Sequence, residues 1–247
     1  MAHEFEVREE LTLAATPDEV WAAIATGPGV DSWFMGRNEI EPREGGTARQ
    51  TIMGVTTEST VTAWEPGLRY AHRTPEGPDG AFMAFEYLIQ GREDGTTVLR
   101  LVHNGFLGDD WEAEYEALSV GDGVYLRKLA AYLSRFPGRT SAYDIFAVGP
   151  QAPAAAVGAA FQAAFGLSGP PVAGAPMRVS VDGLPPAAGQ VLFATAGFLG
   201  AATDDTLYML IHGLHDAVVV QHHSFSGHPE KAEAAAAWQE WLSTRFA

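Results

Sequence analysis

Residues 95–136 read GTTVLRLVHNGFLGDDWEAEYEALSVGDGVYLRKLAAYLSRF. The segment Thr96–His103 is rich in threonine, valine and leucine, which predicts a strand. After a short loop, aromatic and leucine side chains recur at three- and four-residue steps, which predicts a long amphipathic helix. Gly121 and Gly123 fall inside this helical pattern. Because glycine is costly in a helix interior, we expect a break there between a shorter and a longer helix.

A second predicted strand, over residues 82–90, precedes this one, and residues 91–95 predict the turn of a hairpin. With Gly91 opposite Gly95, Glu86 lies opposite Arg100 as a favourable charge pair on one face. The other face also carries His103, by the strand period of two. Its aromatic and apolar pairs are Phe85 with Leu101 and Tyr87 with Leu99. We expect this aromatic face to point inward.

The chain before the hairpin predicts a strand over residues 4–13, then a short helix with Thr16 as its cap. Residues 27–29 end that helix, and residues 31–34 predict a second helical turn. Several strands follow, separated by Gly- and Pro-containing turns. The first half therefore reads as a strand, two short helices, six strands and a long helix. This order predicts an α+β helix-grip fold, in which a curved antiparallel sheet wraps around the long C-terminal helix and encloses a cavity.

These segments resemble the domain of the activator of Hsp90 ATPase homologues (the AHSA1-like domain), within the START-like or Bet v 1-like (SRPBCC) superfamily. The chain departs from the family in one place: the closing helix usually opens with Gly-Trp, whereas Val124 follows Gly123 here. The resemblance implies a helix-grip fold. It implies no shared catalytic residue, because relatives bind hydrophobic small molecules, catalyse cyclisations or act on protein partners. The matching motifs, in order, are TPDEVWAAI, DSWF, EPREGGT, VTAWEPGLRYAH, DGTTVLRLVHNGF and GVYLRKLAAYL.

The second half repeats the pattern of the first in a shorter form. Residues 137–141, PGRTS, predict a boundary, so we expect one domain over residues 1–138 and another over residues 139–247. The repeat is clearest where LIQG (88–91) and HNGF (103–106) match LIHG (210–213) and HHSF (222–225). We infer a trimmed helix-grip-like domain of about five strands with a filled core. Two unrelated domains, and an Ala-Gly-Pro linker in place of a helix within residues 149–176, are the competing interpretations.

Composition excludes several classes of function. The formal net charge of −16 argues against binding to nucleic acid or to anionic membranes. Cysteine is absent, and no run of about 18 apolar residues predicts a membrane span. The first ten residues carry charges where a signal peptide would be apolar, so we expect a cytoplasmic protein. We expect no cofactor, and a homodimer is left open.

Two histidines are the candidates for chemistry. His103 and His72 could each act as an acid or a base in the expected cavity, and Asp122 could orient such a histidine or cap the helix. The competing interpretation is a buried histidine bonded to backbone or to a tyrosine, within an ordinary packed core. The residues expected to line a ligand cavity are Trp33, Phe34, Tyr70, His72, Phe85, Tyr87, His103 and Tyr125.

Four histidines of the second half are possible metal ligands, but their spacing along the predicted hairpin argues against one shared metal site. His212 lies next to the predicted hairpin turn, whereas His222 lies far along the returning strand, roughly 15 Å away at the rise of a strand. His212 could meet His215, and His223 adjoins His222. We therefore predict no metal site.

Three functions remain for the chain. The first is the binding of a hydrophobic or aromatic small molecule in the cavity of the first domain. The second is an enzyme of the cyclase or hydrolase type with a cavity histidine as acid or base. The third is a chaperone-associated role with a protein partner. No Ser-His-Asp arrangement and no nucleotide-binding glycine loop is present to decide whether the protein is an enzyme.

Overall fold

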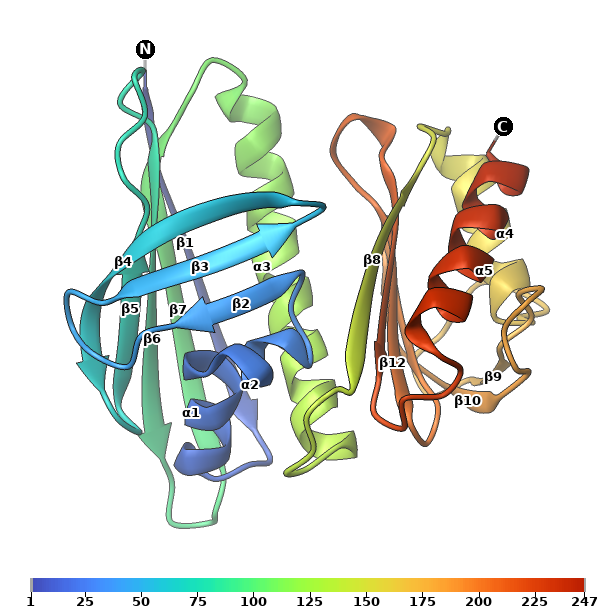
Figure 1. The fold of residues 1–247 in the computed structure, drawn as a ribbon, viewed down its shortest axis with the longest axis horizontal. Coiled ribbons are helices and arrows are strands. Elements are labelled where there is room, and N and C mark those ends of the chain that lie inside the picture. The colour runs from blue at the N-terminus through green and yellow to red at the C-terminus, as the bar shows by residue number, and fades with distance from the viewer. Residues whose placement is uncertain (1, 247) are drawn as a thin grey trace. The chain divides into compact units, whose positions relative to one another are not determined.

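The computed structural model describes residues 2–246. The chain divides into two compact units, Met1–Gly138 and Arg139–Ala247. Each unit combines one antiparallel sheet with a helix that ends the unit (Figure 1). The predicted α+β helix-grip architecture is confirmed, and a second sheet–helix unit follows the first.

Unit 1 contains a seven-stranded sheet in which the first strand pairs with the last. From there the strands follow in reverse chain order to the opposite edge, as β1-β7-β6-β5-β4-β3-β2. This order places β1 and β7 beside the long helix that follows β7. The strands are β1 (His3–Leu13), β2 (Arg37–Ile40), β3 (Thr47–Ile52), β4 (Val55–Glu65), β5 (Arg69–Arg73), β6 (Phe82–Gly91) and β7 (Thr97–Leu107).

Two short helices, α1 (Pro17–Ala25) and α2 (Gly27–Asp31), connect β1 to β2. The predicted cap is confirmed: the Glu19 N–H donates to Thr16 Oγ1 at 3.3 Å, and the Thr16 N–H donates to the Glu19 carboxylate at 2.8 Å. The glycine expected to end α1 instead begins α2, because Thr26 Oγ1 accepts from the Gly29 N–H. The helical turn predicted at residues 31–34 therefore lies at the end of α2.

The register of the β6–β7 hairpin differs from the predicted one by two residues. Gly91 pairs with Thr97 and not with Gly95. The connecting turn is longer because the Arg92 N–H donates to the Thr96 carbonyl, with Gly95 in the left-handed region at φ +82°. A shift of two residues keeps every side chain on its predicted face, so the aromatic face points inward as expected.

The predicted charge pair between Glu86 and Arg100 is wrong for the same reason. Glu86 lies opposite Val102, and its carboxylate instead accepts from Arg69 Nε at 2.6 Å. Arg100 donates to Glu10 on β1. The outer face of the sheet still carries cross-strand ion pairs, but between other strands.

The predicted break at Gly121–Gly123 is absent. A single helix, α3 (Trp111–Arg135), runs through both glycines. Its second half supplies the buried side chains Val124, Leu126, Leu129, Tyr132 and Leu133, among others. The burial of this half stabilises the helix by more than the roughly 1 kcal/mol that each glycine costs.

Unit 2 repeats the same strand order with one strand fewer. The order is β8-β13-β12-β11-β10-β9, again with the first strand beside the last. Strand β11 was not predicted, because it is short and rich in small residues. Its Gly200 lies opposite Phe193, whose ring would be 2.3 Å from a Cβ at that glycine. The strands are β8 (Tyr143–Gly149), β9 (Pro176–Arg178), β10 (Ala188–Thr195), β11 (Phe198–Ala202), β12 (Thr206–His212) and β13 (Val218–Ser224).

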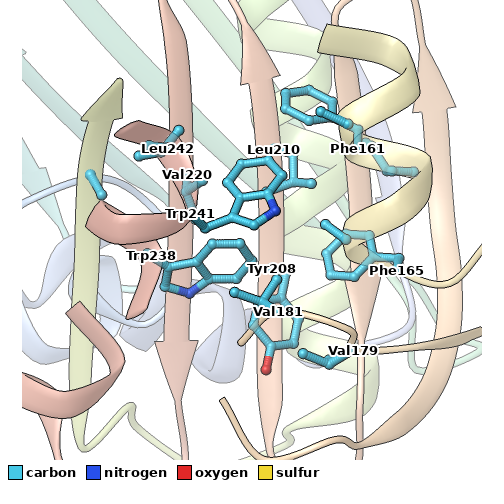
Figure 2. Close-up of a cluster of buried hydrophobic side chains, with 14 of the residues drawn as sticks. Phe161, Phe165, Val179, Val181, Tyr208, Leu210, Val220, Trp238, Trp241 and Leu242 are labelled. Atoms are coloured by element: carbon cyan, nitrogen blue, oxygen red, sulfur yellow. The ribbon is translucent and has the colours of Figure 1, made fainter. Parts of the chain in front are cut away.

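The core of unit 2 lies between its sheet and two helices, α4 (Ala154–Ala164) and α5 (Lys231–Arg245). The alanine-rich segment is therefore helical and not a linker. Trp238 is fully buried, and Trp241 is 7% exposed. A short 3-10 turn, η1 (Leu214–Asp216), joins β12 to β13. Figure 2 shows side chains of α4, α5, β12 and β13 converging in this core.

Candidate functional site

Two rows of paired residues cross the sheet of unit 1 on the face that carries His103. Because His103 contacts α3, this is the face that the long helix covers. Leu99 and Leu101 on the same face are 0% and 4% exposed. The first row runs Val7, His103, Phe85, His72 and Val61, and the second runs Glu9, Leu101, Tyr87, Tyr70 and Trp64.

The histidines of the first row flank Phe85 in a stack. The ring centroids of Phe85 and His103 are 3.9 Å apart, and those of Phe85 and His72 are 5.0 Å apart. Burial lowers the pKa of His72 to about 4, and the nearby His103 acts in the same direction. His72 is therefore neutral near pH 7. Its buried Nδ1 has no hydrogen-bond partner within residues 2–246.

His103 is held by a carboxylate from the middle of α3. Its Nδ1 lies 2.9 Å from Asp122 Oδ2, and the two side chains are 1% and 14% exposed. Asp122 was predicted either to orient a histidine or to cap a helix. It contacts His103 and does not cap a helix. Because a carboxylate only accepts, a neutral His103 ring carries its proton on Nδ1. Nε2 is then a lone-pair acceptor, and it has no partner in the described part of the chain.

Two tyrosines of the second row lie parallel. The rings of Tyr70 and Tyr87 are 6.1 Å apart with an interplanar angle of 9°. Burial raises the pKa of both hydroxyls, and Asp122 raises that of Tyr87 further. Both hydroxyls therefore stay protonated at neutral pH and can donate a hydrogen bond.

The turn after α2 and the helix α3 supply the opposite wall. Phe34 packs against Tyr125 with ring centroids 4.8 Å apart, and the Tyr125 hydroxyl lies 4.0 Å from Met35 Sδ. Trp33 is only 2% exposed, and its Nε1–H donates to the Ala23 carbonyl at 2.9 Å. Trp33 thus fixes α1 to the turn. Met35, which was not predicted as a site residue, has its thioether beside the Tyr125 hydroxyl.

The aromatic side chains in the middle of this interior are only partly buried. Phe34, Phe85, Tyr87 and Tyr125 all keep some exposed surface. None of residues 111–123, all described by the structure, is fully buried. Solvent therefore reaches apolar side chains between the sheet and the first half of α3.

Glu9, which was not predicted as a site residue, lies on the inner face of β1. Its partner across the strands is Leu101, and a Cβ at Gly123 would lie 3.0 Å from its Oε1. Glu9 thus occupies space that Gly123 leaves open on α3. The alternation from Phe5 to Leu13 places Glu9 on the buried face, so the sequence did carry a signal for it.

Within residues 2–246 no group of three His, Cys, Asp or Glu side chains could hold a metal ion. His212 Nε2 lies 3.0 Å from the Ala152 carbonyl oxygen and 3.1 Å from Asp216 Oδ1. His222 pairs with Tyr208, near the other end of the β12–β13 hairpin. No helix in the described chain is long and apolar enough to cross a membrane.

The family model described as activator of Hsp90 ATPase homolog 1-like protein matches residues 14–134. This range lies inside unit 1 and includes every strand of its sheet except β1. Unit 1 is an AHSA1-like domain. The AHSA1-like domain thus carries both rows of the inner face, with Asp122 and Tyr125 on its closing helix. The resemblance seen in the sequence is confirmed.

Three solved structures resemble the chain at low identity. A protein from Mesorhizobium loti is 20% identical and covers 53% of this chain and 98% of its own, with a TM-score of 0.47. The Aha1 dimer from Colwellia psychrerythraea is 18% identical over 54% and 99%, with a TM-score of 0.46. DynU16, a putative protein of the dynemicin biosynthetic locus, is 18% identical over 98% and 95%, with a TM-score of 0.46. No curated protein matches the chain. These similarities are too weak to assign a ligand or a reaction.

Proposed function

We propose that the AHSA1-like domain binds a hydrophobic or aromatic small molecule between its sheet and α3. The observation that carries this proposal is the partial exposure of Phe34, Phe85, Tyr87 and Tyr125 on facing walls. Aromatic side chains that face an interior and remain in contact with solvent gain free energy when a ligand covers them. The fold supports the same conclusion, since AHSA1-like folds generally bind hydrophobic ligands.

The test is a ligand screen on the full chain. Thermal shift and native mass spectrometry against a panel of lipids and aromatic metabolites are expected to find a stabilising ligand that binds one per chain. Phe34→Ala is expected to weaken that binding about ten-fold or more, because it removes one wall of the interior. Tyr115→Ala is the matched control, since this aromatic residue of α3 is 40% exposed. Equal loss in both variants, or no ligand in the panel, would overturn the proposal.

A second candidate function, acid–base catalysis on the bound molecule, is favoured by the contact between His103 and Asp122. A carboxylate that orients a histidine through Nδ1 leaves Nε2 as the working atom of a general base. Once a bound molecule is identified, its conversion is followed with the wild-type chain and with His103→Ala. Full turnover by His103→Ala would dismiss this role.

A further inference from the structure

An unpaired carboxylate lies on the inner face of the AHSA1-like domain. Glu9 is partly buried, and no hydrogen bond or ion pair joins it to any other side chain of residues 2–246. The acids on the outer face of the same strand differ. Glu6 pairs with Arg8, and Glu10 pairs with Arg100. The Glu9 oxygens are not among the buried atoms without a partner, so water solvates them, and a ligand that displaces this water must supply a hydrogen-bond donor or a positive charge in its place.

A glycine of α3 leaves space for the Glu9 carboxylate. The absence of a side chain at Gly123 is what lets Glu9 Oε1 approach α3, where a Cβ would be 3.0 Å away. The next residue toward the N-terminus, Asp122, turns its own carboxylate to His103. Glu9 lies diagonally across the strand pair from His103, within about 7–8 Å. Two acids and one buried histidine with a free acceptor atom thus gather at one end of the inner face.

Aromatic rings lie beyond Leu101 in the same row as Glu9. Tyr87 and Tyr70 follow Glu9 and Leu101 in the second row, and Asp122 is close enough to raise the pKa of Tyr87. Carboxylates beside aromatic faces are the surroundings that recognise a protonated amine, through a charge-assisted hydrogen bond and cation–π attraction. Lys128 on α3 is 0% exposed, and its ammonium lies 5.8 Å from the Tyr125 ring centroid. Among the described residues, Lys128 forms no ion pair with Glu9 and does not neutralise that carboxylate.

From this arrangement we infer that the molecule bound by the AHSA1-like domain is an organic cation: an aromatic or apolar body that carries a protonated amine, with Glu9 as the carboxylate that binds it. The inference rests on the proposed function and narrows its ligand class. The net charge of −16 acts in the same direction, because it attracts cations and repels anions.

Three probes with one aromatic body separate the head groups. Naphthalen-2-ylmethanamine carries a cation, naphthalen-2-ylmethanol a neutral hydroxyl and 2-naphthoate an anion. Titrations of the full chain near pH 7, by calorimetry or native mass spectrometry, are expected to give the amine a dissociation constant about ten-fold below that of the alcohol. The naphthoate is expected to bind most weakly.

Glu9→Gln is expected to bring the amine and the alcohol to within about two-fold of each other, because it removes the charge and keeps the shape. Glu10→Gln is the matched control: it changes the net charge equally on the outer face, and it should keep the ten-fold preference. Circular dichroism verifies that both variants fold, and Glu9→Leu is a second variant at the same position.

The outcomes separate the two proposals. If the alcohol binds as tightly as the amine to the wild-type chain, or if Glu10→Gln removes the preference as fully as Glu9→Gln, the inference on the cation is wrong and the proposed function stands. If none of the three probes binds, the inference on the cation is wrong, and the panel of lipids and aromatic metabolites decides the proposed function separately.

Discussion

His103 Nδ1 and Asp122 Oδ2 lie 2.9 Å apart and thereby join β7, the strand next to the edge strand β1, to the middle of α3. The contact joins the fourth inward position of β7 to a turn of α3 that is flanked by Gly121 and Gly123. Because both side chains are largely out of solvent, the hydrogen bond is worth more than one at the surface. The hydrogen bond fixes the His103 ring relative to α3, and it thereby sets the space between the sheet and this helix.

Removal of Asp122 is expected to destabilise the AHSA1-like domain. Asp122→Ala leaves His103 Nδ1 without an acceptor, at a cost of about 1–3 kcal/mol in the free energy of unfolding. Asp122→Asn keeps an acceptor oxygen and should cost clearly less. Urea-dependent hydrogen exchange, measured on peptides from residues 1–138, reports the unfolding of this domain separately. Equal losses in the two variants would show that the hydrogen bond contributes little.

The two glycines of α3 are expected to respond differently to alanine. Gly121→Ala meets no atom within 4 Å, so it should raise the free energy of unfolding by about 1 kcal/mol through helix propensity. Gly123→Ala should gain less or lose stability, because its Cβ must displace the Glu9 carboxylate.

The double variant Glu9→Ala with Gly123→Ala tests this cause. It should recover the gain expected for a helical glycine when each value is compared with Glu9→Ala alone. Melting curves of the four variants suffice. A gain for Gly123→Ala equal to that for Gly121→Ala would contradict the close approach of Glu9 and Gly123.

Gly105 is expected to tolerate no side chain. It lies in β7 at φ +151°, and a Cβ would come 2.0 Å from the Phe82 carbonyl oxygen across the strand pair. Gly105→Ala should therefore cost about 1–3 kcal/mol or more, since backbone must move. Gly108→Ala is the control, because the neighbour at 3.0 Å is the carboxylate of Asp79, a side-chain end that can rotate away. Thermal melting distinguishes the two.

Unit 2 is expected to lose stability as pH falls below about 6.5. Burial lowers the pKa of His222 to about 3, whereas an unfolded histidine titrates near 6.5. Between these values the unfolded state binds more protons, so the stability present above about pH 6.5 is lost as pH falls. Between about pH 7 and about pH 5 the loss from this residue approaches 2 kcal/mol, at about 1.4 kcal/mol per pKa unit.

His222→Phe should remove this part of the pH dependence, and the exposed His228→Gln should leave it unchanged. Urea midpoints at the two pH values, followed by hydrogen exchange on peptides of residues 139–247, give the comparison. A wild-type slope that survives in His222→Phe would assign the effect to other groups.

Each unit has a buried histidine, and the two neutral rings carry their proton on different nitrogens. In unit 2 the Trp238 Nε1–H donates to His222 Nδ1 at 3.1 Å, so a neutral ring carries its proton on Nε2. In the AHSA1-like domain the carboxylate of Asp122 requires the proton on Nδ1 of His103. Both Nε2 atoms are buried without a partner in the described chain. The repeat that the sequence revealed is thus one of fold, and the chemistry of its two histidines differs.

Side-chain periodicity predicted most of the elements and the inner faces of the β6–β7 hairpin, but it did not reveal β11 or the continuity of α3. Alternation in β7 placed His103, Leu101 and Leu99 inward, and a shift of two residues in register left these faces unchanged. The cap of α1 could also be predicted from the sequence, because a capping box is a contact between residues three apart. The length of the β6–β7 turn was not, since it depends on one hydrogen bond between Arg92 and Thr96.

By itself, then, the sequence determined that a curved antiparallel sheet closes on a long helix, and that a shorter copy follows, because both rest on patterns local to a few turns or strands. Tertiary structure alone decided that α3 continues through Gly121 and Gly123, that Asp122 contacts His103, and that Glu9 faces Gly123 without a partner. These relationships join residues far apart in the chain, and their energies come from packing across the domain. The residues proposed to bind a ligand are positioned by those long-range contacts.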